Sequence, residues 1–105
     1  MSEMRVFSTG ATRDSVVGKI VYDKFLSVEV IKRYGEYMLK HSIQSDGVAR
    51  EGDNWKKGMS KSVYLSSAFR HFVSVWDLRS KDLPCDEELC ALLFNIMGLL
   101  HEEVK

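Results

Sequence analysis

Apolar and polar positions alternate in a way that predicts a first helix from Ser27 to about Ile43. Apolar residues recur there at three- and four-residue intervals, which places them on one face of a helix. Charged residues occupy the opposite face, and the Ser27 hydroxyl is expected to cap the first turn. The predicted buried stripe consists of Val30, Ile31, Tyr34, Met38 and, at its edge, Tyr37.

A second helix is predicted after a polar loop at residues 44–58. Gly52 and Gly58 tolerate the backbone angles that such a loop needs, and Ser60 or Ser62 is placed to cap the helix that follows. Helical spacing then predicts one buried face. Its members are Leu65, Ala68, Phe69, Phe72, Val75 and Trp76.

The third predicted helix follows Pro84, with Asp86 as its expected cap. From Leu89 to Leu100 it is apolar on nearly every face, interrupted by Asn95 and Gly98. A helix that is apolar all round is buried all round, and the rest of so small a chain cannot surround it. We therefore expect a homo-oligomer, and a tetramer in particular, because two-fold interfaces are the commonest solution.

The first 25 residues are less regular. Arg5–Phe7 and Lys19–Tyr22 have the composition of strands, and a polar loop lies between Gly10 and Gly18, so a short hairpin and an extended arm both remain possible. The expected fold is mainly α: a small bundle of about three helices with an extended or short β N-terminal arm, completed by oligomerisation. We expect residues 1–105 to form one domain.

Composition narrows the class of partner. Hydrophobic residues make up 45% of the 105 residues, and 15 basic residues balance 15 acidic ones. Without a basic surface a duplex nucleic acid is an unsuitable partner, whereas one small nucleotide needs only a few local charges. The spacing of Cys85 and Cys90 fits no zinc pattern, so idle thiols are expected. No apolar run is long enough to span a membrane, and a cytoplasmic location is expected.

Two sequence blocks, Asn54–Gly58 (NWKKG) and Ser67–His71 (SAFRH), resemble a phage-encoded family of dATP/dGTP diphosphohydrolase N-terminal domains. The resemblance extends to Gly10–Asp14, to Gly18-Lys19 and to Tyr22 and Asn95. It implies a nucleotide ligand, with Trp55 stacking on the base. From composition alone, Arg13 and Lys19 are ordinary solvated charges, and only the resemblance makes them phosphate contacts. The ligand-binding residues that it implies are Arg13, Asp14, Lys19, Tyr22, Asn54, Trp55, Arg70, His71 and Asn95.

Two main functions remain open. The all-α nucleotide pyrophosphohydrolases hold magnesium on paired carboxylates three residues apart on two helices, and this pattern is missing from the sequence. The favoured hypothesis is therefore a protein without catalytic residues or cofactor. It would sequester small nucleotide signals of antiviral defence, cyclic ones in particular, in the host cytoplasm.

The alternative is a Mg²⁺-dependent dATP/dGTP diphosphohydrolase, with metal ligands at Glu29, Glu36, Glu88 or Glu102. In a third interpretation, Arg70 and His71 are surface residues of a structural oligomer. The family's usual histidine before the leucine of the last helix is replaced here by Glu88. This difference favours holding a nucleotide over cleaving it.

Overall fold

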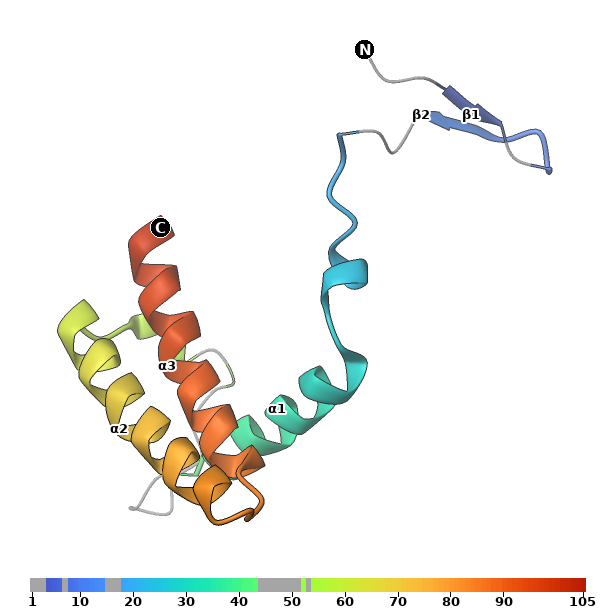
Figure 1. Ribbon diagram of the computed structural model, residues 1–105. Coiled ribbons are helices and arrows are strands. Elements are labelled where there is room, and N and C mark those ends of the chain that lie inside the picture. Colours follow the sequence, from blue (N-terminus) through green and yellow to red (C-terminus); the bar gives the residue numbers. More distant parts are fainter. Residues whose placement is uncertain (1–3, 7, 15–17, 44–51, 53) are drawn as a thin grey trace.

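The computed structural model describes the chain except for residues 1–3, 7, 15–17, 44–51 and 53. It is mainly helical with a short β hairpin near its N-terminus, as the sequence predicts (Figure 1). The elements in order are β1 (Met4–Val6), β2 (Thr12–Asp14), η1 (Tyr22–Phe25), α1 (Val28–Lys40), η2 (Asn54–Lys57), α2 (Lys61–Ser80) and α3 (Asp86–Val104).

Helices α2 and α3 run antiparallel and side by side, and they form the main packed unit (Figure 1). Their contact is built around Tyr64, whose side chain is only 1% exposed. The Tyr64 ring lies against Gly98, where an added Cβ would come within 2.8 Å of the Tyr64 Cδ1 atom. Phe94 meets the same ring edge-on, with the ring centroids 6.2 Å apart. Gly98 is therefore required because it lets the tyrosine ring approach the backbone of α3.

The predicted buried face of α2 is only half-buried at Ala68 and Val75, and it is wrong at its large residues. The less exposed positions follow Tyr64 at helical spacing and include His71 and Leu78. Four residues that were predicted to be buried are instead exposed: Leu65, Phe69, Phe72 and Trp76. The physical reason is that close packing needs small partners, and on α3 these are Ala91 and Gly98, both buried opposite the Tyr64 face.

Helix α1 begins as predicted. The Ser27 hydroxyl accepts a hydrogen bond from the Val30 amide at 3.3 Å, although the helix ends at Lys40 and not near Ile43. Val30 and Ile31, predicted to be buried, are about half exposed because α1 packs on α3 far less closely than α2 does. The remaining predicted stripe residues, Tyr34, Tyr37 and Met38, are half-buried.

Two other predicted caps are corrected. Ser60 is the N-cap of α2, but its side chain makes no capping bond, and its hydroxyl instead lies 3.2 Å from that of Ser62. Cys85 is the N-cap of α3, and the predicted cap Asp86 is the first helical residue. The Asp86 carboxylate is instead engaged by Arg33 at 2.7 Å, so a contact with α1 has replaced the local cap.

The N-terminal arm extends away from the helices (Figure 1). In the hairpin, β1 and β2 are antiparallel with Arg5 opposite Arg13, and Gly10 in the connection adopts a φ of 87°. Lys19–Ile20 is not a strand, and Tyr22 begins the short helix η1. The radius of gyration is 19.2 Å, whereas a compact domain of this length would have about 13 Å. Much of the chain therefore lies outside a common core.

Helix α3 is buried on one side and exposed on the other. Cys90, Ala91, Asn95 and Gly98 are its buried residues, whereas Ile96 and Leu100 are exposed. Among the described residues, the structure has no helix with the length and apolar character that crossing a membrane requires.

Candidate functional site

The residues predicted to bind a ligand lie in three separate places. One group is on the arm (Arg13, Asp14, Lys19 and Tyr22), a second is in η2 (Asn54 and Trp55), and a third is on the helical hairpin (Arg70, His71 and Asn95). The arm points away from helices α2 and α3, so these groups do not converge within one chain (Figure 1). The side chains of Arg13, Asp14 and Asn54 are not among those that the structure describes.

Arg70 has an unusual set of partners on the exposed side of α2. Its Nη1 donates to the Ser66 hydroxyl at 2.9 Å, and its Nη2 donates to the Ser67 hydroxyl at 2.8 Å. The two serines precede Arg70 by four and three residues, the spacing at which side chains meet on a helix. Within the described part of the chain, Arg33 and Arg79 pair with carboxylates, but Arg70 does not. Its guanidinium is thus oriented by hydroxyls, and no carboxylate of the described residues neutralises it.

His71 and Asn95 lie in the contact between α2 and α3. The Nδ1 atom of His71 is 2.8 Å from a carboxylate oxygen of Glu88, which links the two helices across a half-buried position. Asn95 is buried, as the sequence predicts, and its side-chain amide donates to the Ala91 carbonyl at 2.8 Å. The hydrogen-bond partner of Asn95 therefore lies in its own helix. In this arrangement both residues serve the helix contact.

Trp55 packs at the far end of α3. Its ring meets that of His101 edge-on, with the centroids 5.2 Å apart, and the indole stays half-buried. Gly58 closes the turn with a φ of 82° and an amide that donates to the Trp55 carbonyl at 3.0 Å. An added Cβ at Gly58 would collide with the Glu102 carboxylate. The position of Trp55 is therefore fixed by the tight turn after it.

A cluster of charges fastens α1 to the start of α3. Arg33 donates to Asp86 at 2.7 Å and to Glu87 at 2.8 Å, and Lys40 reaches Glu87 at 3.0 Å. The hydrogen bond from Arg33, supported by those from Lys40 and His41, lowers the pKa of Glu87 to about 2. The pKa of Asp86 is lowered by the same guanidinium. Both carboxylates are thus held in their charged form.

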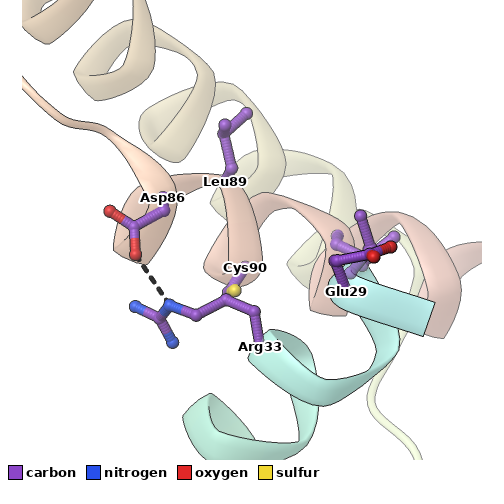
Figure 2. Close-up of a pocket in the computed structure, with 7 residues that line it drawn as sticks. Glu29, Arg33, Asp86, Leu89 and Cys90 are labelled. Carbon is purple, nitrogen blue, oxygen red and sulfur yellow. Dashed lines mark hydrogen bonds and ion pairs between the residues drawn. The ribbon is translucent and has the colours of Figure 1, made fainter. Parts of the chain in front are cut away.

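Beside this cluster lies a small cavity of about 240 Å³ between α1 and α3 (Figure 2). Figure 2 shows Arg33 reaching across it to Asp86, with Cys90 behind the arginine stem. Burial raises the pKa of the Cys90 thiol, which keeps it protonated and unreactive. Both cysteines are free thiols, as predicted. The residues that line the cavity are Glu29, Val30, Arg33, Asp86, Leu89, Cys90 and Leu93.

Three of the carboxylates considered as metal ligands have other partners. Glu29 accepts from the Ser27 hydroxyl at 3.2 Å, Glu88 pairs with His71, and Glu102 pairs with Lys105 at 2.8 Å. No group of three or more His, Cys, Asp or Glu suited to a metal ion occurs among the described residues.

Sequence reasoning overlooked the partners of the predicted residues. Ser66 and Ser67 could have been found from their spacing to Arg70. No such signal exists for Glu88 with His71 or for His101 with Trp55, since these pairs form between segments distant in the sequence.

Comparison with family models, curated proteins and solved structures finds no match to this chain. The resemblance to the dATP/dGTP diphosphohydrolase domains therefore stays a prediction.

Proposed function

We propose that this protein binds a small phosphate-bearing nucleotide and holds it without cleaving it. The observation that supports the proposal is the environment of Arg70. Two serine hydroxyls orient its guanidinium on an exposed face of α2, and no carboxylate among the described residues pairs with it. A cation that is positioned but not neutralised retains its full attraction for an anion.

The chemistry of this group suits a phosphate. A guanidinium presents a planar fork of N–H donors that matches phosphate oxygens. Each serine oxygen that accepts from Arg70 still carries an O–H that it can donate. Donors of both kinds therefore lie on one surface, with three side chains contributing. Helical spacing also preorganises them, so less conformational entropy is lost on binding.

Sequestration is the simplest use of such a group. Donors that contact a phosphate equally in the ground state and in the transition state provide affinity without accelerating a reaction. The proposal rests on the phosphate contact at Arg70. The groups that contain Trp55 and Arg70 do not converge within one chain, so the predicted stacking of Trp55 on a base is a separate expectation that the proposal does not use.

The first test follows the fate of the ligand. The protein is incubated with a panel of linear and cyclic nucleotides and Mg²⁺, and the bound and free nucleotides are then identified by mass spectrometry. We expect a bound nucleotide to be recovered unchanged, and binding to persist in excess EDTA. Repeated conversion of dATP or dGTP to monophosphate and pyrophosphate would instead establish the diphosphohydrolase.

The second test addresses Arg70 by titration calorimetry with the nucleotide that the panel identifies. Arg70→Ala should weaken binding by about 2–4 kcal/mol if the arginine pairs with a desolvated phosphate. Arg79→Ala is the matched control, since Arg79 lies on the same helix but pairs with Asp82 at 3.4 Å. The double variant Ser66→Ala/Ser67→Ala should have an intermediate effect. Equal losses for Arg70→Ala and Arg79→Ala would remove Arg70 from the site.

A further inference from the structure

Helix α2 carries a second apolar stripe beside the one that packs on α3. Leu65, Phe69, Phe72 and Trp76 are spaced by four, three and four residues, which places them along one line on the helix. Phe69 is 64% exposed and Trp76 is 67% exposed, and the other two are about half exposed. No charged residue belongs to this set, which we call the Phe69 stripe.

Nothing in the described part of the chain packs over this stripe to an extent comparable with α3 on the Tyr64 face. Isolated exposed apolar residues are normal on protein surfaces, but two phenylalanines and a tryptophan in line form a contiguous patch. Such patches mark interaction sites. Aromatic residues are also the type most enriched at the centres of protein interfaces.

The total accessible surface of the chain, with its extended arm included, is larger than that of a compact monomer. The chain exposes 8509 Å², whereas a compact monomer of its 12.0 kDa would expose about 6,000 Å². The excess is therefore about 2,500 Å² per chain, and a stable interface needs only about 800 Å² from each partner. The arm that extends away from the helices contributes to this surplus, so the surplus is only an upper limit on the surface that a second copy could cover.

We propose that the Phe69 stripe packs against the same stripe of a second copy of this chain, with the two α2 helices antiparallel about a two-fold axis. The centre of the stripe falls between Phe69 and Phe72, so the axis would bring these two rings against those of the second copy. Such an interface is self-complementary, which a two-fold requires. The 4-3-4 spacing is the one by which helices interlock along a seam.

Charge argues for a second copy over an anionic lipid surface. A helix that lies on such a surface carries basic residues beside its apolar face. The charged groups near the C-terminal end of the stripe are instead paired in opposite signs, Lys81 with Asp77 at 3.1 Å and Arg79 with Asp82 at 3.4 Å. The proposal is independent of nucleotide binding, because Arg70 and its serines lie on a different face of α2.

The test measures the mass of the protein in solution by sedimentation and light scattering. We expect at least twice the 12.0 kDa of one chain at micromolar concentration. Phe69→Glu and Trp76→Glu should each weaken self-association by about 100-fold or more, because a charge would be buried without a partner. Both residues are exposed in the single chain, so the variants should keep their helical circular dichroism. Leu39→Glu is the matched control, since Leu39 is an exposed apolar residue on α1, and it should leave the mass unchanged.

A second measurement locates the interface on Trp76. The chain has two tryptophans, so Trp55→Phe leaves the Trp76 indole as the sole reporter. Its fluorescence should be shielded from solvent in the assembled protein and shift to longer wavelength when Phe69→Glu is added. A wild-type mass of 12.0 kDa at micromolar concentration would overturn the proposal. So would an equal loss of assembly in Leu39→Glu, a solvent-exposed Trp76 in the assembled protein, or binding to anionic vesicles without self-association.

Discussion

Helix α3 has a neighbour on two sides, and the two contacts are made of different chemistry. Toward α2, the buried Tyr64 ring fits against Gly98 and beside Phe94. Toward α1, Arg33 reaches exposed carboxylates at Asp86 and Glu87 next to an open cavity. The first contact removes apolar surface from water, whereas the second joins charges that remain hydrated.

This difference predicts how stability is distributed. Burial of apolar area is the dominant favourable term in folding, and surface ion pairs contribute little. The α2–α3 hairpin should therefore be the stable unit, and α1 should detach from it at a lower free energy, as a local opening. Each of the following predictions tests that ranking.

Tyr64→Ala should have the largest effect, because it empties the centre of the hairpin contact. We expect a loss of about 3–5 kcal/mol in the free energy of unfolding, as for other large aromatic truncations in cores. Urea unfolding followed by circular dichroism would measure it. Tyr22→Ala on the arm is the matched control, with an expected change within about 0.5 kcal/mol because its side chain is exposed. Comparable losses at both tyrosines would contradict the ranking.

Gly98→Ala should cause the next largest loss in the free energy of unfolding, since the added Cβ would overlap the Tyr64 ring. The expected cost is about 1–3 kcal/mol, as for overpacking elsewhere, despite the better helix propensity of alanine. Gly35→Ala on α1 is a control of opposite sign. Nothing lies within 4 Å of an added Cβ there, so the variant should stabilise α1 by up to about 1 kcal/mol. Thermal unfolding of the two variants in parallel would show whether their midpoints move apart.

Ser27→Ala should cost about 1 kcal/mol because it removes the capping bond to the Val30 amide. The loss should be local to α1. Amide hydrogen exchange should therefore accelerate in Val28–Lys40 while the amides of α2 and α3 keep their protection. Ser60→Ala is the control, because Ser60 occupies an N-cap but makes no side-chain capping bond. Uniformly faster exchange in all three helices would mean that α1 and the hairpin unfold as one unit.

Acid should have the smallest effect and should act on the same junction. The pKa of Glu87 falls from 4.5 to about 2, chiefly through the hydrogen bond from Arg33. A lowered carboxylate pKa adds stability that is fully present above the unfolded value and is lost as pH falls from 4.5 toward 2. We expect exchange of the α1 amides to accelerate over this range, with little change in Glu87→Gln. The effect is small because the carboxylate is exposed. An unchanged acid response in Glu87→Gln would exclude Glu87 as its source.

For the candidate site, the sequence supplied the residue types but not their surroundings. The partners of Arg70 lie four and three residues before it on the same helix. Spacing in the sequence alone can therefore predict them. Glu88 opposite His71 is a different case, because the pair forms only when α2 and α3 dock. The N-terminal arm, which carries Lys19 and Tyr22, extends away from helices α2 and α3, and this separation is likewise a property of the whole chain (Figure 1).

The sequence by itself determined the helices, because their periodic apolar positions and the Ser27 cap act between residues a few positions apart. It could not determine which apolar stripe of α2 would be buried in this chain. Two sets of α2 residues have helical spacing: the less exposed positions that follow Tyr64, and the Phe69 stripe, which contains more of the large residues. The tertiary structure selected Tyr64 because Gly98 leaves room for its ring on α3. That fit depends on residues more than thirty positions away, which a local pattern does not contain.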